Sequence, residues 1–349
     1  MTPLIECVPN FSEGRNPHVI EAIAAAIRAV EGAKLLHVDP GFSAHRTVMT
    51  IAGAPEAVVE AAFQAMRTAA ELIDMRKHQG THPRMGATDV CPLVPVRDIS
   101  LEEVVKLARQ LGQRVGEELG IPVYLYEAAA TRPERRNLAT VRSGEYEGWR
   151  QKIQNPDWQP DFGPATFHAR SGHSVIGARP FLVAYNLNLN TRSVALANAV
   201  AFDLRERGRL AREDGHPDSP LRRDAQGRPI RIPGRCPGVK AIGWYIEEYG
   251  LAQVSTNVTD LSRSALHEVF EAGRECARWR GLRVTGSELI GLVPREALLA
   301  AGRFYAEAQG LSPLPSQDEL LHLAVQSLGL DHLADFDVEA RILENAVGI

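Results

Sequence analysis

In the second half of the chain, hydrophobic residues occupy every other position from Phe181 to Leu189, and the positions between them become increasingly polar. A period of two over this length predicts a β-strand with one buried face. The patterns that follow predict a helix, two strands, a second helix and a last strand, over Ser193–Arg207, Val239–Glu247, Leu251–Val258, Leu266 to about Gly281, and Val284–Val293.

The first half of the chain shows the same order of patterns. They predict a strand, a helix, two strands, a helix and a strand, over Leu4–Val8, Asn16–Val30, Ala33–Val38, Thr47–Ala52, Pro55–Ile73 and Val90–Val96. Asn16 followed by Pro17 is a typical helix start, because the asparagine caps free amide groups and proline has no amide hydrogen. Pro92 and Pro95 place the last strand at a sheet edge or beside a bulge, because proline cannot donate a hydrogen bond.

One more helix and strand lie between the two halves. Ser100 and Glu103 have the spacing of a capping box, which predicts a helix that ends at Gly120, and Ile121–Tyr126 is predicted to be a strand. Each half therefore has the order βαββαβ, which is that of a ferredoxin-like subdomain. We predict an α+β protein with two such subdomains, joined near Ser174–Ala178.

Composition and charge narrow the class of protein. The chain has 349 residues, enough for about two domains, and its 39 basic and 43 acidic residues give a net charge of −4, which does not favour a nucleic-acid-binding protein. No apolar stretch approaches the ~18 residues that cross a membrane, and the N-terminus has no secretory signal pattern. The four cysteines are widely spaced, unlike those of a disulfide framework or a zinc ribbon. We expect a cytoplasmic enzyme that acts on small molecules, not on nucleic acid or membranes.

Two predicted loops contain candidate functional residues. The polar loop after the first strand contains Asn10 and Ser12, although these residue types are also common in ordinary strand-to-helix connections. In the predicted hairpin, Asp39 is able to orient a reacting group and Arg46 to bind a carboxylate through its planar guanidinium. For Asp39 alone, a turn residue that accepts backbone hydrogen bonds is the simpler interpretation.

A third loop contains two histidines four residues apart. On a helix, His78 and His82 would form a metal-binding pair, but Gly80 and Pro83 between and after them do not favour a helix. The alternatives are a histidine that acts as general acid and base, and a loop histidine bonded to the backbone. The loop location favours the catalytic alternative, and we predict no metal site.

A glycine-rich segment precedes the predicted junction of the two subdomains. It contains Phe162 and Phe167, either of which is able to stack on a flat ligand. It matches neither of the common glycine-rich phosphate-binding motifs, and the alternative is a flexible linker.

Several of these segments, in this order, carry a family resemblance. They are Glu6-Cys7-Val8-Pro9-Asn10-Phe11-Ser12-Glu13-Gly14, Arg46-Thr47-Val48, His82-Pro83-Arg84-Met85-Gly86-Ala87, Asp89-Val90-Cys91-Pro92, Pro122-Val123-Tyr124-Leu125-Tyr126, Asp161-Phe162-Gly163-Pro164, Ile242-Gly243-Trp244-Tyr245 and Ala252-Gln253-Val254-Ser255-Thr256-Asn257. Together they cover nearly the whole chain, which resembles the formiminotransferase family.

The resemblance implies a reaction and a fold. The family transfers a formimino group from N-formimino-L-glutamate to N5 of tetrahydrofolate in histidine breakdown and one-carbon metabolism. Its two ferredoxin-like subdomains face each other with their sheets across a folate-binding tunnel, and its members are dimers or larger. On this basis we expect tetrahydrofolate as co-substrate, no metal and a homodimer, with subdomains at 1–177 and 178–349, extra C-terminal helices in the second, and no cyclodeaminase domain.

The resemblance also implies site residues. The family's catalytic acid and base corresponds to His82, and its folate segment corresponds to Gly163, Pro164, Ala165, Thr166, Phe167, His168, Ala169, Arg170, Ser171 and Gly172. The middle of this segment varies in the family, so the roles of its individual residues do not transfer. As inferences of our own, Asp39 orients His82, and Asn10, Ser12, Arg46 and Arg84 bind the substrates. Formyl transfer from N-formylglutamate, a non-catalytic folate-binding protein and a metal-dependent hydrolase are the alternatives.

A long insertion between Gly208 and Gly238 departs from the family pattern. It contains seven arginines, at positions 209, 212, 222, 223, 228, 231 and 235. A mobile surface loop is one interpretation. The others are that the insertion attracts the anionic glutamate tail of folate, or that it packs at a contact between subunits.

Overall fold

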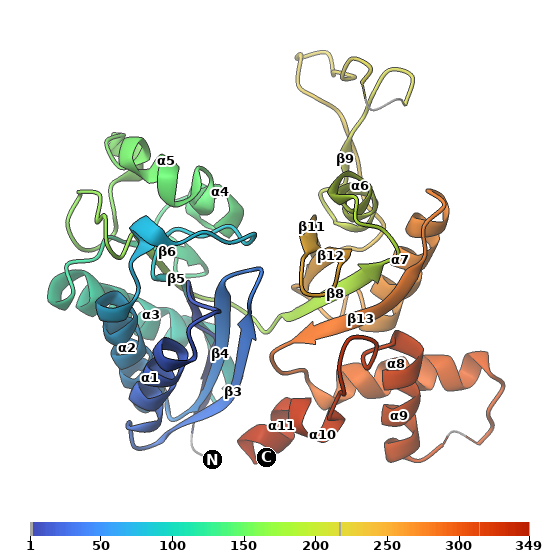
Figure 1. The fold of residues 1–349 in the computed structure, drawn as a ribbon, viewed down its shortest axis with the longest axis horizontal. Coiled ribbons are helices and arrows are strands. Elements are labelled where there is room, and N and C mark those ends of the chain that lie inside the picture. Colours follow the sequence, from blue (N-terminus) through green and yellow to red (C-terminus); the bar gives the residue numbers. More distant parts are fainter. Residues whose placement is uncertain (1–2, 216–217, 314, 349) are drawn as a thin grey trace. The chain divides into compact units, whose positions relative to one another are not determined.

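The structure consists of two compact units. The computed structural model describes residues 3–215, 218–313 and 315–348. One unit extends to Phe181 and the other begins at Leu182. Each has its own main sheet with helices against it, so the protein is a mixed α+β protein with two subdomains (Figure 1). In the described residues, no helix is long and apolar enough to cross a membrane.

The first unit contains the predicted elements in the predicted order, together with further short elements that were not predicted. It contains β1 (Leu4–Cys7), β2 (Asn10–Phe11), α1 (Pro17–Arg28), β3 (Ala33–Gly41), β4 (Arg46–Gly53), α2 (Pro55–Leu72), β5 (Thr88–Arg97), α3 (Leu101–Glu118), β6 (Val123–Glu127), α4 (Leu138–Arg142), α5 (Glu145–Lys152) and β7 (Ser174–Ala178). The Asn16 side chain caps α1, with Pro17 at its first position, and Ser100 and Glu103 form the predicted capping box of α3. These two helix starts are therefore determined by residues that are neighbours in the sequence.

The strand that contains Pro92 and Pro95 lies inside the sheet. Strand β5 pairs with β1 and β2 on one side and with β7 on the other. The predicted edge position is therefore wrong, whereas the predicted bulge is confirmed, because the register with β1 shifts beside Pro95. Proline lacks a donor but keeps its acceptor, and the Pro92 carbonyl accepts a hydrogen bond from the Val8 amide at 3.1 Å.

The segment Ser174–Ala178 is strand β7 and not the connection between the units. It pairs in parallel with β5 and β6. Gly177 allows the Tyr126 ring to lie over the strand, since a Cβ atom there would be 2.5 Å from Tyr126 Cδ1. Because β7 is short and contains this glycine, its sequence resembles a linker.

Both faces of the first sheet are covered at its β5–β7 side. Helices α1, α2 and α3 pack on one face, where they bury Cys7, Cys91 and Leu125 (Figure 1). The neighbouring residue Tyr124 points to the opposite face and packs with Trp149 of α5. All four cysteines are buried and free, and the Sγ atoms of Cys7 and Cys91 are 3.5 Å apart.

The second unit contains β8 (Val183–Leu189), α6 (Val194–Leu204), β9 (Arg209–Leu210), β10 (Arg231–Ile232), β11 (Val239–Ile246), β12 (Leu251–Val258), α7 (Leu266–Arg278), β13 (Val284–Ile290), α8 (Arg295–Ala308), α9 (Gln317–Leu328), α10 (Val338–Arg341) and α11 (Leu343–Val347). Its main sheet has the strand order β11-β12-β8-β13, with antiparallel neighbours. The alternating residues of β8 are buried, and Leu187 packs against Gly273 of α7, where a Cβ atom would be 2.3 Å from its Cδ1.

The arginine-rich insertion is structured in its described residues. Strands β9 and β10 form an antiparallel ribbon, and isolated bridges join Arg212 to Leu221 and Arg223 to Pro229. Asp224 closes the tip by accepting hydrogen bonds from the amides of Gln226 and Arg228. In the described residues, the insertion is therefore a paired ribbon and not a structureless loop. We call residues 208–235 the arm, and Figure 1 shows that it projects from the second unit.

Candidate functional site

The candidate site lies where β3 ends and β4 begins. Arg46 is the first residue of β4 and pairs with Gly41 at the end of β3, and Asp39 is two residues before that end. Asn10 on β2 pairs with Val48 of β4, two residues beyond Arg46. The hairpin therefore brings Asp39, Arg46 and Asn10 to one end of the first sheet.

The histidine loop crosses this end of the sheet. The amide and hydroxyl of Thr81 donate hydrogen bonds to the Ser43 carbonyl at 3.0 and 3.1 Å. The approach depends on Gly80, because a Cβ atom there would lie 2.4 Å from the Ala44 carbonyl oxygen. His82 follows directly, and its Nε2 contacts Nη1 of Arg46.

Burial and neighbouring charge keep His82 neutral. Burial lowers the pKa of His82 well below its usual value, and the positive charges of Arg46 and Arg142 lower it further. Burial and the charge of Arg142 also lower the pKa of Arg46 to about 10, so that Arg46 stays charged at neutral pH. The carboxylates of Asp89 and Asp39 oppose this shift, which shows that both lie near Arg46. In the resting site, the Arg46 guanidinium therefore donates to a neutral imidazole.

Ser12 and Asn10 hold the first loop in place. The Ser12 hydroxyl donates to the Gly86 carbonyl at 2.7 Å, and its amide donates to Ala87 at 2.9 Å. The Asn10 side chain donates to the Val8 carbonyl at 2.9 Å. Ser12 is buried, and its two hydrogen bonds join the first loop to the histidine loop.

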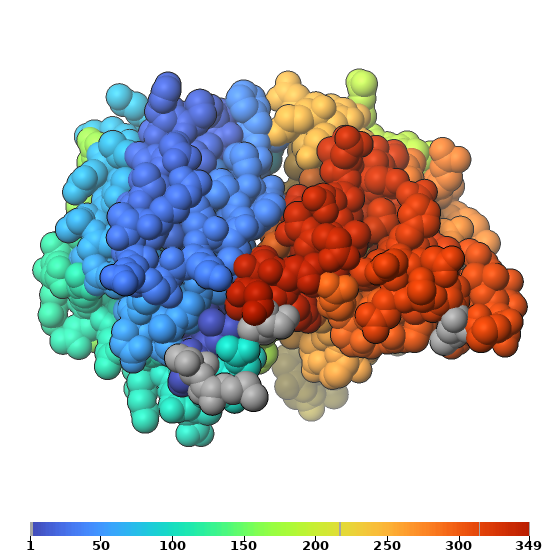
Figure 2. Space-filling model, turned by 90° about the horizontal axis from the view of Figure 1, so that it is seen from below, coloured from blue at the N-terminus to red at the C-terminus, as the bar shows by residue number. Residues whose placement is uncertain are grey.

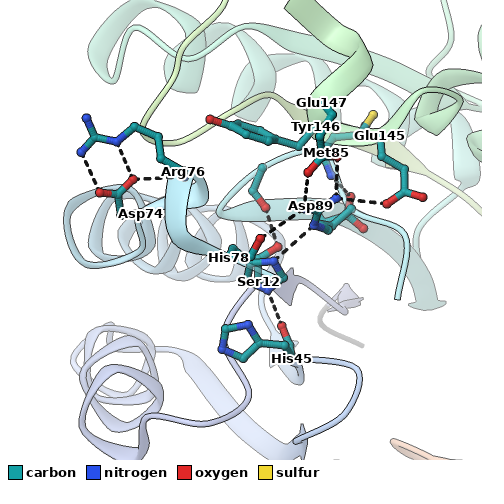
Figure 3. A network of polar contacts seen from close by, with 12 residues as sticks. Ser12, His45, Asp74, Arg76, His78, Met85, Asp89, Glu145, Tyr146 and Glu147 are labelled. Atoms are coloured by element: carbon teal, nitrogen blue, oxygen red, sulfur yellow. Dashed lines mark hydrogen bonds and ion pairs between the residues drawn. The ribbon is translucent and has the colours of Figure 1, made fainter. Parts of the chain in front are cut away.

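Arg84 is enclosed by groups of the protein itself. Figure 3 labels three of its partners, His78, Glu145 and Glu147. Its guanidinium pairs with Glu147 at 2.6 Å and with Glu145 at 3.1 Å, and its Nε donates to Nδ1 of His78 at 3.2 Å. The Glu147 contact raises the pKa of Arg84. Arg84 thereby fixes the histidine loop against α5.

Arg142 is a site residue that the sequence analysis missed. It lies on α4 and forms an ion pair with the buried Asp89 at 2.5 Å, and Asp89 also accepts a hydrogen bond from the Met85 amide at 2.9 Å. The available sequence signal was Asp89 itself, because a buried carboxylate beside an apolar strand requires a partner.

His78 has both ring nitrogens engaged. Nδ1 accepts from Arg84, so Nε2 carries the proton and donates to the His45 carbonyl at 2.8 Å. Its lone pair is therefore not available to a metal. In the part of the chain that the structure describes, no three His, Cys, Asp or Glu side chains lie together as a metal-binding group.

The glycine-rich segment lies beside the histidine loop. Gly86 and Gly172 form a β-bridge, and a Cβ atom on Gly172 would lie 2.2 Å from the Met85 carbonyl oxygen. At the other end of the segment, Asp161 forms a buried ion pair with Arg135 at 2.8 Å. Two predicted motifs about 80 residues apart are therefore joined, and residues 163–166 between the anchors are exposed.

Aromatic rings support the same segment. Phe167 contacts the rings of Tyr146 and His173 at 5.2 and 5.6 Å, and the Tyr146 hydroxyl donates to the Ala169 carbonyl at 2.5 Å. The His173 ring is buried, and neither of its nitrogens has a hydrogen-bond partner. His168 accepts from the Ser171 amide, and Arg170 donates to the Glu71 carbonyl, so both side chains hold the backbone.

The second unit has a polar face on its sheet that the sequence analysis also missed. Gln253 is fully buried and donates to Asn188 at 2.8 Å and to Glu288 at 3.0 Å. Asn186 and Tyr249 donate to the same Glu288 carboxylate at 3.1 and 2.8 Å. The sequence signal was the run of asparagines at alternating positions of β8.

Two models of known protein families match the chain, one over each of its two units. A model of the N-terminal subdomain of the formiminotransferase domain matches residues 4–179, and one of the formiminotransferase domain matches residues 184–348. The chain is 49% identical over 347 residues to formimidoyltransferase-cyclodeaminase of Rattus norvegicus, covering 99% of this chain and 60% of that protein.

Two shorter relatives are matched over nearly their whole length. Glutamate formimidoyltransferase of Streptococcus pyogenes is 40% identical, and that of Thermoplasma acidophilum is 39% identical. Each match covers 88% of this chain, and 95% and 93% of the respective relatives. With both subdomain models matched in order, and with relatives of this identity, the chain belongs to the formiminotransferase family.

Proposed function

We propose that this protein transfers the formimino group of N-formimino-L-glutamate to N5 of tetrahydrofolate, giving 5-formiminotetrahydrofolate and L-glutamate. The observation that carries the proposal is the contact between neutral His82 and Arg46 at the end of the first sheet. This contact places a proton acceptor, the His82 imidazole, beside a cation that binds carboxylates, the Arg46 guanidinium. The names of the bacterial and archaeal relatives support the same reaction.

His82 is the general base and acid of this reaction. N5 attacks the formimino carbon, and the resulting tetrahedral intermediate breaks its bond to the glutamate nitrogen. His82 takes the proton from N5 and returns it to the leaving nitrogen, so that no net proton is gained or lost. Such a shuttle contributes about 10²–10⁴-fold to the rate.

The arginines divide into two roles. Arg46 binds a carboxylate of the donor, which draws its guanidinium away from Nε2 and frees the lone pair of His82. Arg142 lies beside it and adds positive charge, and Asp39 orients the pair. Arg84 is already paired with Glu145 and Glu147, so we assign it the positioning of the histidine loop.

Folate lies along the glycine-rich segment in this proposal. The exposed residues 163–166 allow close approach of a flat ring, and Phe167 offers a stacking surface. Each unit is a ferredoxin-like subdomain in this proposal, which the order of its strands and helices supports. Asn10 and Ser12 contribute to the donor side of the site.

The decisive experiment compares two donors and two proteins. We expect wild-type protein with tetrahydrofolate to release glutamate from N-formiminoglutamate much faster than from N-formylglutamate. His82→Ala should lose about 10²–10⁴-fold in kcat and still bind tetrahydrofolate. Faster turnover of the formyl donor would support the formyl alternative. Folate binding without turnover of either donor would indicate a binding protein, and near-normal turnover by His82→Ala would overturn the mechanism.

A further inference from the structure

An aromatic side chain is exposed at the end of the first sheet that carries the candidate site. Phe42 lies in the turn between β3 and β4, just before Arg46, and it is 57% exposed. The guanidinium of Arg15, also exposed, lies over the Phe42 ring at 5.0 Å from its centroid. Among the described residues, no carboxylate pairs with Arg15. In Figure 2, blue atoms of the N-terminal part of the chain form much of the visible surface of the first unit. An apolar ring and an unpaired cation are therefore offered to solvent side by side.

The turn that carries Phe42 is held in place by its neighbours. The Phe42 carbonyl accepts hydrogen bonds from the amide of His45 and from Nε of Arg15, both at 3.1 Å. His45 has a left-handed backbone, with φ at 48°, and its Nε2 lies 3.2 Å from the Glu13 carboxylate. Its ring stacks on that of His78 at 4.2 Å, and Figure 3 labels both residues. Such a backbone is uncommon for a residue with a side chain and persists where surrounding contacts fix it. A ligand that stacks on a ring held in this way loses less conformational entropy.

The order of the strands relates this turn to the glycine-rich segment. Strands β3, β4, β2, β5 and β7 are neighbours in that order, and β5 and β7 are parallel. The turn follows the end of β3, the histidine loop precedes β5, and the glycine-rich segment precedes β7, so all three lie at the same end of the sheet. Neighbouring strands are about 4.8 Å apart, which places the turn and the segment ~19 Å apart with the histidine loop between them.

Tetrahydrofolate is an elongated molecule with its reacting atom in the middle. N5 lies where the pterin ring joins the link to the aminobenzoyl group, so the pterin extends to one side of N5 and the aminobenzoylglutamate to the other. When N5 is at His82 and the pterin lies along the glycine-rich segment, the aminobenzoylglutamate extends towards the turn between β3 and β4.

We infer, on the basis of the proposed function, that Phe42 and Arg15 bind the aminobenzoylglutamate of tetrahydrofolate. The benzoyl ring stacks on the Phe42 ring, and a carboxylate of the glutamate pairs with the Arg15 guanidinium. Both residues lie outside the chemical step, because neither reaches N5 in this arrangement. They determine instead which acceptor is bound, by favouring a folate over a pterin without the aminobenzoylglutamate.

The test compares two acceptors that share N5. One is tetrahydrofolate, and the other is a tetrahydropterin with a methyl group in place of the aminobenzoylglutamate. The KM for the tetrahydropterin divided by the KM for tetrahydrofolate is the acceptor ratio, and it should exceed one in the wild type. Phe42→Ala should reduce this ratio about 10-fold, and Phe42→Tyr, which keeps a ring, should retain it. Arg15→Gln should reduce the ratio and also its dependence on salt, because an ion pair with the glutamate is lost.

Trp279→Ala is the matched control. Trp279 is 62% exposed in the second unit, and the Arg235 guanidinium lies over its ring at 5.3 Å from the centroid. This variant should keep the wild-type acceptor ratio, and circular dichroism checks the folding of every variant.

Calorimetric titration with both acceptors repeats the comparison without turnover. A wild type that binds tetrahydrofolate and transfers nothing would overturn the proposed function, and the ratio of dissociation constants would still decide the role of Phe42 and Arg15. An acceptor ratio that both Phe42→Ala and Arg15→Gln leave unchanged would overturn the inference. An equal rise in KM for both acceptors would also overturn it, because the turn would then act on the geometry at His82 and not on the aminobenzoylglutamate.

Discussion

Burial and neighbouring charge act on the His82 side chain in the same direction. A buried imidazolium loses hydration, and it would also lie beside the positive charges of Arg46 and Arg142, so the neutral form is strongly preferred. A base that is already neutral needs no deprotonation before it acts. The same arginines supply positive charge for an anionic substrate, so one arrangement serves both purposes.

Replacing Arg46 tests this coupling. In Arg46→Met, one of the two charges that suppress protonation is lost, so the pKa of His82 rises and the acid limb of the kcat/KM profile shifts to higher pH. The KM for N-formiminoglutamate should rise about 10–100-fold, because a charge-assisted hydrogen bond is lost. Steady-state kinetics across pH measures both effects.

Arg46→Lys and Arg109→Met are the matched comparisons. The lysine keeps the charge but not the planar fork, so the pH profile should stay nearer to that of the wild type while KM still rises. Arg109 is exposed on α3, and its replacement should change neither quantity. An Arg46→Met profile that coincides with the wild type would contradict the coupling.

At the scale of elements, two backbone crossings assemble the site. Gly80 brings the histidine loop against the β3–β4 turn, and Gly86 brings it against Gly172. At each crossing, the neighbour is backbone and cannot move aside as a side chain would. The geometry of the site therefore depends on residues that carry no chemistry of their own.

Gly86→Ala should separate the histidine loop from the glycine-rich segment. The added Cβ atom would lie 2.3 Å from the His173 carbonyl oxygen. We expect the free energy of unfolding to fall by about 1–3 kcal/mol and the KM for tetrahydrofolate to rise. Urea unfolding and kinetics measure these changes.

Gly148→Ala is the control for a glycine substitution as such. Gly148 lies in helix α5, and nothing is within 4 Å of its Cβ position. This variant should gain about 0.5–1 kcal/mol in stability, because alanine is the better helix former. Equal behaviour of the two variants would show that the crossing at Gly86 has no structural role.

The elements that the sequence predicts are those that depend on neighbouring residues, whereas elements that depend on distant residues were missed. Helix starts such as Asn16-Pro17 and Ser100–Glu103 depend on neighbouring residues, and they were predictable. Strand β7 was mistaken for a connection, because its pairing with β5 and β6 depends on residues far away in the chain. Helices α4 and α5 were not predicted either, since their short polar sequences show little hydrophobic periodicity.

At the scale of the whole molecule, buried histidines link stability to pH. Burial lowers the pKa of His78 to about 4 and that of His173 to about 3. In the unfolded chain, both titrate near the ordinary value of about 6.5. Below that value the unfolded state binds more protons than the folded state, so acid favours unfolding.

We therefore expect stability to fall as the pH decreases from about 6.5 towards 3. Each of the two histidines adds up to about 1.4 kcal/mol per pH unit to the slope. His173→Phe should reduce this slope and cost little at neutral pH, because no hydrogen bond of the ring is lost. Urea unfolding at several pH values measures the slope. An unchanged slope would contradict the prediction, and His18→Phe on exposed α1 is the control.

The site as a whole was only partly predictable. The segments that contain Asn10, Ser12, Asp39, Arg46 and His82 were singled out from residue types and resemblance, and the structure brings them together within the first unit. The enclosure of Arg84 and the place of Arg142 were not predictable, because both depend on α4 and α5 packing over the histidine loop. Partners of this kind are set by tertiary structure and not by local pattern.

The four buried cysteines provide natural reporters of local opening. Cys7 and Cys91 lie in the first unit, and Cys236 and Cys276 lie in the second. A thiol reagent reacts with such a side chain only when the surrounding structure opens. Labelling the native protein over time, followed by mass spectrometry of the cysteine peptides, would measure the opening rate of each unit separately. The kinetic independence of the two units is thus measurable without introducing a probe.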